Sequence, residues 1–389
     1  MIPMLRGTAT IFAFISAFLP AFAQEKAATP GLSAAQPAAA KPPRPPCGIR
    51  TPELGWHAEA QFIAGMDGTK FTDSMTPEQK VAWNHYSRAG GADWKRVKSQ
   101  YLDRIDDWRK TSLAGVPTGT AFYPFSGPDA ANVLRFFPDA REYLMIGLEP
   151  VGCIPTNPSD FAASYWPNLR QSLQSVVAMG FFKTDDMRKD FSADGVEGVL
   201  PALLFLVARS GYTVTDVMPV MIGADGKVVA AGPARAETRG VTIKFEDEKR
   251  NSRALTYFSL NLQDSSLKRK PGTVQYLSGL PKPATLVKSA SYLMHKKYFS
   301  TIREVILSRS VAIVEDDSGI PYRFFDKSVW DVRLYGRYTK PIQMFDAWFQ
   351  EDLKSAFTAD EAKVEALEFG IGYKYRPKTS TLILARRRG

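Results

Sequence analysis

The sequence predicts an α/β protein with a Rossmann-like mixed sheet, helices on both faces of the sheet and a helical N-terminal cap. Three observations predict this fold. Patterns typical of strands and of helices alternate at the spacing of βα units through most of residues 116–389. Residues 118–155 contain a strand–turn–helix–strand unit, and residues 56–113 are mostly helical in their spacing of apolar side chains.

The first 23 residues have the three parts of a secretory signal peptide. Arg6 supplies a positive charge, residues 9–18 are apolar, and Ala21-Phe22-Ala23 is a small-x-small cleavage motif. The apolar stretch is too short to span a bilayer comfortably, and no later run reaches the length of a transmembrane helix. We therefore expect a periplasmic or secreted protein that is not transmembrane.

Residues 24–46 are almost entirely Ala, Pro, Gln and Lys, which predicts a flexible linker that cannot bury a core. The linker is either a tether to a membrane or wall, or a passive leader. The remaining chain divides into a helical cap over residues 47–115 and an α/β domain over residues 116–389. The α/β domain is either one unit or two subdomains that divide near residues 225–240.

The chain has two cysteines, Cys47 and Cys153. In an oxidising compartment an even count favours a disulfide, and only one intramolecular pairing exists. Closing so long a loop is worth roughly 3–5 kcal/mol in the chain-entropy model. Two separate thiols are the alternative.

The helical cap has a clear start signal in Thr76-Pro77-Glu78, where a capping residue precedes a proline at the first helical position. A further helix has apolar residues at three- and four-residue spacings, at Trp94, Val97, Tyr101 and Ile105. These patterns predict helices packed on the sheet.

The central unit begins with an apolar strand over residues 121–125 and a turn at Ser126-Gly127-Pro128-Asp129. A helix over residues 130–137 and a second strand over residues 143–148 follow, and Glu149-Pro150 ends this strand. Ligands of open α/β sheets bind at the carboxyl ends of the strands. Ser126, Asp129 and Glu149 are therefore predicted to lie there together.

Later elements follow from the same patterns. Helices are predicted over residues 159–180, 185–191, 195–210, 285–295 and 299–308, and strands over residues 212–222, 241–245, 254–262 and 311–314. Residues 328–350 contain a strand-like and then a helical stretch. Residues 371–375 and 381–385 are predicted to pair as a closing hairpin.

Glu149, with Asp129 and Ser126, is the first candidate site. A carboxylate at the end of a buried strand can act as a general acid or base, or accept hydrogen bonds from ligand hydroxyls. The alternative is structural: Asp129 caps a helix, and Glu149 pairs with an arginine or lysine.

Asp316-Asp317-Ser318 is the second candidate site. Adjacent carboxylates at a strand end suit a hard cation or a two-carboxylate hydrolase. Successive strand residues point to opposite faces, so at most one of the pair faces a given site, and Ser-Gly is ordinary turn chemistry. His295 is most simply a partner of a helix C-terminus. Metal-binding, phosphate-loop and nucleophile-elbow motifs are absent from the sequence, so no metal is expected.

The formal net charge of +10 favours an anionic partner, such as an envelope lipid or acidic glycan. A basic protein without such a partner is the alternative. The basic clusters at residues 268–270 and 386–388 are short and lack interleaved aromatic residues, so no nucleic-acid partner is expected. Tyr335, Tyr338 and Trp348 are either core residues or a sugar-binding surface.

Three fragments, at residues 123–129, 147–152 and 316–323, resemble those of an uncharacterised group of exported Gram-negative bacterial proteins. This resemblance implies export and brings no activity with it. The central unit is also similar to that of class I Rossmann-type methyltransferases, in which a glycine turn faces the cofactor and an acidic residue binds its ribose. Gly127 and Glu149 match those positions, with Ser126 beside them, and the closing hairpin is similar to theirs.

This chain departs from the methyltransferase pattern, because its turn has one glycine and Pro128 lacks a backbone N–H. Adenosylmethionine is also a cytosolic compound, so the cofactor stays unknown. The leading hypothesis is an envelope protein that binds a small polar or glycan-like ligand near Glu149. The alternatives are an envelope hydrolase using Glu149 or Asp316, and a methyltransferase-like enzyme.

Overall fold

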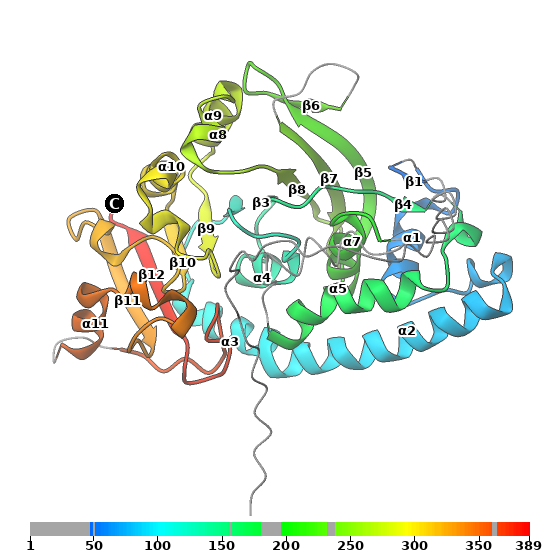
Figure 1. The fold of residues 1–389 in the computed structure, drawn as a ribbon, viewed down its shortest axis with the longest axis horizontal. Helices are drawn as coiled ribbons and strands as arrows, with labels where there is room; N and C mark the ends of the chain where they lie inside the picture. The colour runs from blue at the N-terminus through cyan, green and yellow to red at the C-terminus, as the bar shows by residue number, and fades with distance from the viewer. Residues whose placement is uncertain (1–46, 50, 156, 180–195, 232–237, 360–363) are drawn as a thin grey trace, which may run out of the picture. The chain divides into compact units, whose positions relative to one another are not determined.

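A ten-stranded mixed sheet forms the centre of the computed structural model, which describes residues 47–49, 51–155, 157–179, 196–231, 238–359 and 364–389 (Figure 1). The predicted α/β class is confirmed, as are the helices on both faces and the helical N-terminal cap. The proposed signal peptide and linker, and the helix expected over residues 185–191, lie outside the described residues.

The sheet has the strand order β11-β12-β10-β9-β2-β3-β8-β7-β5-β6. The five inner strands from β10 to β8 are mutually parallel, whereas the strands at both edges are antiparallel. β1 and β4 form a separate antiparallel pair. The strands are β1 (Cys47–Gly48), β2 (Thr120–Tyr123), β3 (Glu142–Gly147), β4 (Ile154–Pro155), β5 (Thr213–Ile222), β6 (Val228–Ala230), β7 (Thr238–Glu246), β8 (Ser252–Ser259), β9 (Ala284–Val287), β10 (Ala312–Glu315), β11 (Trp330–Gly336) and β12 (Thr381–Arg387).

The helices cover both faces of this sheet. The α-helices are α1 (Gly55–Ile63), α2 (Pro77–Val97), α3 (Asp103–Ser112), α4 (Ala130–Phe136), α5 (Tyr165–Met179), α7 (Leu200–Arg209), α8 (Asp264–Leu267), α9 (Pro271–Ser278), α10 (Ser300–Arg309) and α11 (Glu351–Thr358). Shorter turns of helix are η1 (Thr72–Ser74), the π-helical η2 (Lys98–Leu102), η3 (Pro158–Asp160), η4 (Leu293–His295), η5 (Lys297–Phe299), η6 (Tyr322–Phe324) and η7 (Gln343–Trp348).

The parallel strands follow a Rossmann-type order. The five parallel strands β2, β3, β8, β9 and β10 can be numbered 1 to 5 along the chain. Across the sheet these five strands then lie in the order 3-2-1-4-5. The chain leaves β2 toward β3 on one side and later returns to β9 on the other side. The switch point, where such folds form a crevice, therefore lies between the carboxyl ends of β2 and β9.

Each parallel strand is apolar on both faces because each face has its own helical layer. Along β2, Ala121 and Tyr123 pack with α1, α2, α4, α5 and α7, whereas Phe122 packs with α8, α9 and α10. In β3, Tyr143 packs in the same layer as Ala121 and Tyr123, and Leu144 packs in the same layer as Phe122. Such strands have continuous apolar runs, which is how their presence can be predicted from the sequence.

The N-terminal cap is one long helical run beside α5 (Figure 1). Thr76 begins α2 with a complete capping box: its hydroxyl accepts from the Gln79 backbone, and the Gln79 side chain accepts from the Thr76 backbone. The π-helical turn η2 joins α2 to α3 without a loop. Along this run Trp83, Tyr86 and Trp94 are buried in the core, as predicted for a cap packed on the sheet.

Several elements differ from the sequence prediction. The helix expected over residues 285–295 is wrong, because β9 occupies Ala284–Val287 between β2 and β10. This short apolar run is buried on both faces, and periodicity cannot distinguish such a strand from a buried helix. The hairpin of residues 371–375 with 381–385 is also wrong, since β12 pairs with β11 and β10 instead. Helices α8 and α9 were not predicted.

The stretch at residues 225–240, where a subdomain break stayed open, lies between β5 and β7, and these strands pair with each other along most of their length. Residues 44–389 group as one compact unit.

Candidate functional site

The candidate acid, base and ligand-binding residues from the sequence lie at the carboxyl edge of the parallel strands. Ser126, Gly127 and Asp129 follow β2, Glu149 follows β3, and Asp316 follows β10. Because β2, β3, β9 and β10 run in the same direction, these turns lie at one edge of the sheet. We call this region the strand-end cluster and include Lys288 and Asp317 in it.

Asp129 is held in a buried ion pair. Its carboxylate lies 2.7 Å from the Lys288 ammonium group, and the two side chains are 2% and 1% exposed. The hydroxyl of Tyr123 and the amide of Asn132 donate hydrogen bonds to the same carboxylate. Asp129 stands at the N-cap position of α4, but its side chain does not cap the helix. The carboxylate therefore joins the ends of β2 and β9 across the switch point.

The hydroxyl of Tyr101, from the π-helical turn η2, donates to Asn132 and so connects the N-terminal cap to this ion pair. Burial, followed by the charge of Asp129, raises the pKa of Tyr101 well above its ordinary value, so the phenol stays protonated as a donor.

Glu149 is also buried, at 3% exposure, and it has protein partners. The Tyr257 hydroxyl donates to its backbone carbonyl at 2.9 Å and lies 3.3 Å from its carboxylate. A Cβ atom added to Gly147 would stand only 2.6 Å from this carboxylate and 2.9 Å from the Cα of Gly127. Glycines at these two positions therefore allow the first strand-end turn and the Glu149 carboxylate to pack together, with Gly127 at a φ of 52°.

Ser126 is 5% exposed and directs its hydroxyl to the protein backbone. Its Oγ lies 2.9 Å from the carbonyl of Gly127 and 3.1 Å from that of Ile146, and its N–H donates to Ile146 at 2.8 Å. The side chain stabilises the turn between β2 and α4.

Asp316 and Asp317 lie just beyond β10 and are both buried. Asp316 accepts from the backbone of Ser289 and from both the backbone and the hydroxyl of Ser318. Burial, followed by the charge of Asp317, raises the pKa of Asp316 to about 6. Asp317 accepts a 2.6 Å bond from the Tyr292 hydroxyl, and burial raises its pKa as well.

The strand-end cluster thus consists of carboxylates that protein donors already surround. Asp129 and Asp316 share one electrostatic environment, because both raise the pKa of Tyr101 and of Tyr123. Burial, ion pairing and saturated hydrogen bonding are the usual features of a structural polar network. Asp129 therefore has a structural role, but as the ion-pair partner of Lys288 and not as the helix cap that the sequence suggested as the alternative.

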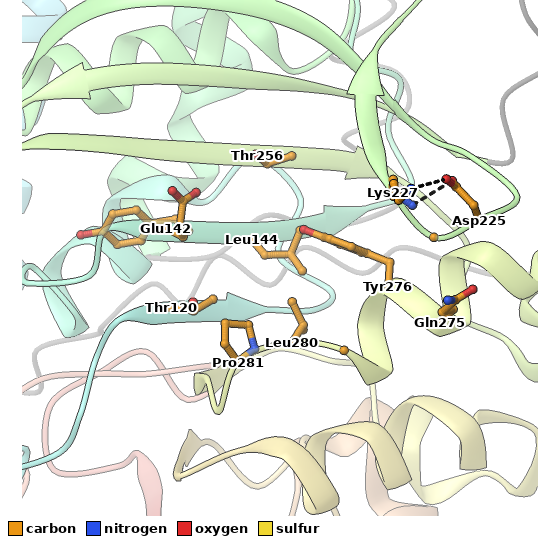
Figure 2. Close-up of a pocket in the computed structure, with 13 residues that line it drawn as sticks. Thr120, Glu142, Leu144, Asp225, Lys227, Thr256, Gln275, Tyr276, Leu280 and Pro281 are labelled. Carbon is orange, nitrogen blue, oxygen red and sulfur yellow. Dashed lines mark hydrogen bonds and ion pairs between the residues drawn. The ribbon is translucent and has the colours of Figure 1, made fainter.

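A different place in the fold is open to solvent. A pocket of about 500 Å³ lies over the amino-terminal parts of β2 and β3, between the sheet, helix α9 and the turn that connects β5 to β6 (Figure 2). We call it the sheet-face pocket. Its volume lies within the range typical of small-molecule sites. Its lining includes Thr120, Glu142, Thr256, Gln275 and Tyr276.

Thr120, Glu142, Leu144 and Thr256 share one face of the sheet because side chains alternate along each strand. Thr120 and Glu142 are register partners at the starts of β2 and β3, and Leu144 is the partner of Thr256 in β8. From the other side, α9 extends the ring of Tyr276 toward Leu144, and Gln275 lies near the turn (Figure 2).

Two groups dominate the chemistry of the sheet-face pocket. Glu142 is exposed at the start of β3, and the partial burial of its carboxyl raises its pKa. Burial, with Glu142 as the second cause, raises the pKa of Tyr276 to about 12, so the phenol is neutral at physiological pH. At the rim, Lys227 pairs with Asp225 at 3.4 Å, and both side chains are largely exposed.

The turn at the rim needs a glycine. Gly226 has a φ of 74°, and a Cβ atom there would stand 3.1 Å from the carbonyl of Gly272 and from the side chain of Gln275. The turn therefore lies directly against α9.

Sequence reasoning missed both Lys288 and the sheet-face pocket. Lys288 directly follows the apolar run of β9, and this position signals a strand end only once β9 is recognised as a strand. The pocket residues are single, ordinary polar residues that come from distant segments, so no local pattern marks them.

Of the other predicted residues, Tyr335 and Tyr338 are core residues with exposures of 1% and 2%. The backbone of Cys47 pairs with Pro155, two residues beyond Cys153. The side chain of Cys47 lies outside the described residues, so the disulfide stays a prediction.

Within the described ranges no three His, Cys, Asp or Glu side chains are arranged to hold a metal ion. None of the helices described has the length and apolar character needed to cross a membrane. Neither a scan against models of known protein families nor a search of curated proteins finds a match for this chain.

Proposed function

We propose that this chain is an exported cell-envelope protein that binds a small, hydroxyl-rich ligand of the glycan type without transforming it. The observation that carries the proposal is the sheet-face pocket, whose volume suits one or two sugar rings and whose lining combines a carboxylate, an amide, hydroxyls and a tyrosine.

The chemistry of the pocket fits such a ligand. The Glu142 carboxylate is exposed to solvent and can accept hydrogen bonds from vicinal hydroxyls. The amide of Gln275 both donates and accepts, and the Tyr276 ring offers an apolar face beside its hydroxyl. These groups come from the rigid sheet and from a helix, which favours binding without a large rearrangement of the protein.

The rival function is an envelope hydrolase that uses the strand-end cluster. The pKa of Asp316, raised to about 6, is the observation that favours it, since a general acid works best with a pKa near the ambient pH. Against it, the carboxylates of the cluster are buried, and those of Asp129 and Asp316 are occupied by protein donors. A hydrolase would need these buried carboxylates to become accessible to a substrate, whereas binding in the sheet-face pocket does not.

The methyltransferase-like alternative is supported by the topology of the sheet but not by the residues at the switch point. The 3-2-1-4-5 order of the parallel strands supports a Rossmann-type topology. At the switch point, where a nucleotide-type cofactor lies in such folds, this chain has the Lys288–Asp129 ion pair and the Pro128 turn. Since fold does not imply function, we propose no cofactor.

Export to the envelope rests on the signal-peptide pattern of residues 1–23 and is part of the proposal. The backbone pairing of β1 with β4 supports a Cys47–Cys153 disulfide, which an oxidising compartment would allow to form.

Titration of the purified protein with neutral mono- and disaccharides, followed by calorimetry, tests the proposed function. We expect saturable binding that weakens about tenfold or more in Glu142→Gln, because a hydrogen bond to a charged group is lost. Glu248→Gln removes the same charge from the exposed turn between β7 and β8 and serves as the matched control. Equal binding by both variants would place the ligand elsewhere. An absence of binding across the panel would refute a neutral-sugar ligand.

A further inference from the structure

Three basic residues lie on the segments that follow β9 and β10, away from the sheet-face pocket. Lys296 lies between η4 and η5, Arg303 is in α10, and Arg323 is in η6. The guanidinium carbons of Arg303 and Arg323 lie 4.3 and 5.0 Å from the centre of the same ring, that of Phe324. The Lys296 ammonium lies 5.7 Å from the ring centres of Tyr298 and Trp348. We call Lys296, Arg303 and Arg323 the cationic cluster.

Aromatic rings lie against all three cations, and Arg303 also donates a 2.6 Å hydrogen bond from Nη1 to the carbonyl of Met294. None of the three forms an ion pair with a carboxylate of the described residues. The charges of Glu304 and, less strongly, Asp264 act on Arg303, and Asp264 also accepts hydrogen bonds from Ser300 and Thr301 at the start of α10. Like charges at short range repel one another, so such a grouping favours an anion that completes it.

His295 lies beside this cluster. Its ring lies 5.8 Å from that of Trp348, and its Nε2 is buried with no hydrogen-bond partner among the described residues. Burial, followed by the charges of Arg323 and Arg303, lowers the pKa of His295 to about 3. The histidine is therefore neutral at physiological pH, and both arginines act on it.

From this arrangement we infer an anion-binding site for a phosphate monoester, formed by the cationic cluster beside His295. Planar guanidinium groups bind phosphate oxygens in pairs, and a lysine adds a point charge. A monoester carries close to two negative charges at neutral pH and suits three cations better than a singly charged diester does. Cation–π contacts preorganise the cluster, because they fix the cations before the anion arrives. The phosphate belongs either to a soluble ester or to the headgroup of a lipid such as phosphatidic acid.

Calorimetric titration with glycerol 3-phosphate, in a buffer without phosphate, tests the site. We expect saturable binding that weakens about tenfold or more in the double variant Arg303→Gln/Arg323→Gln, since charge-assisted hydrogen bonds are lost. The double variant Lys268→Gln/Arg269→Gln removes two exposed charges elsewhere and is expected to bind as the unaltered protein does. Arg303→Lys/Arg323→Lys keeps the charge but loses the paired geometry, and it is expected to bind more weakly as well.

Two further readouts distinguish the source of the phosphate and the mode of binding. Sedimentation with phosphatidylcholine vesicles containing phosphatidic acid, compared with phosphatidylglycerol vesicles of matched charge, identifies a lipid source if only the former bind. Nuclear magnetic resonance is expected to show a higher pKa for His295 once glycerol 3-phosphate is bound, because an anion favours the imidazolium.

Three results would overturn the inference: no saturable binding to glycerol 3-phosphate or to phosphatidic acid vesicles, equal loss of binding in both glutamine double variants, or equal affinity for dimethyl phosphate. The last two would indicate a diffuse effect of the net charge.

Discussion

At the scale of single residues, the Asp129–Lys288 ion pair shows that a residue of a candidate site can have a structural role, here in connecting the ends of two strands. The carboxylate was predicted at a strand end from its position after an apolar run, and it does lie there. Its partner, however, comes from a strand more than 150 residues later, and only the folded chain brings the two together. The local pattern gives the position of a residue but not its partner.

This pair supports a prediction about stability. Replacing Lys288 by methionine leaves the Asp129 carboxylate buried without its countercharge, so we expect a loss of about 3–5 kcal/mol in the free energy of unfolding. In the double variant Asp129→Asn/Lys288→Met the uncompensated charge is gone, and the loss is expected to be smaller. Urea unfolding of the three proteins measures the difference. A double variant less stable than the Lys288→Met variant would contradict this account.

A second residue-scale prediction concerns Glu59, which is buried in α1. Burial raises its pKa to about 7 in the folded protein, from 4.5. The folded state therefore holds this proton more tightly than the unfolded chain does. The resulting stability is complete below pH 4.5 and is lost as the pH rises through about 7.

We expect Glu59→Gln to remove this dependence. Relative to the unaltered protein, the variant should gain up to about 3 kcal/mol in stability between pH 4.5 and pH 8. Denaturant unfolding across this range measures the gain. The exposed Glu53→Gln serves as the control, and a Glu59→Gln effect that does not change with pH would refute the assignment.

At the scale of elements, the sequence was most informative where strong local signals coincide. The β2–α4–β3 unit has apolar runs, a Ser-Gly-Pro-Asp turn and a polar strand end, and each of these has a local cause. The strand β9 has only four residues, one of them a threonine, and weak boundaries, so it was predicted as a helix. The partner of β12 could not be predicted either, because pairing with β11 and β10 depends on contacts across long stretches of chain.

The strand pair β1–β4 makes the disulfide testable. Alkylation of the purified protein without reductant, followed by intact-mass measurement, is expected to modify no thiol, and two modified thiols would contradict the bond. After reduction we expect a loss of about 3–5 kcal/mol in the free energy of unfolding, from the chain-entropy model for a loop of this length. Cys47→Ser/Cys153→Ser, measured without reductant, should show the same loss.

At the scale of the whole molecule, the two ends of the parallel strands differ in character. The carboxyl ends, where α/β folds commonly bind ligands, are tied together here by buried carboxylates and Lys288. The sheet-face pocket lies over the amino-terminal parts of the same strands. No single segment could reveal it, because β2, β3, β8, α9 and a turn each contribute only one to three residues.

The most direct test of this account is a chemical-shift titration of the isotopically labelled protein with a disaccharide that binds. We expect the largest shift changes at Thr120, Glu142, Gln275 and Tyr276, with little change at Glu149 and Asp316. Changes concentrated at Glu149 and Asp316 instead would move the binding site to the strand-end cluster and contradict the central claim.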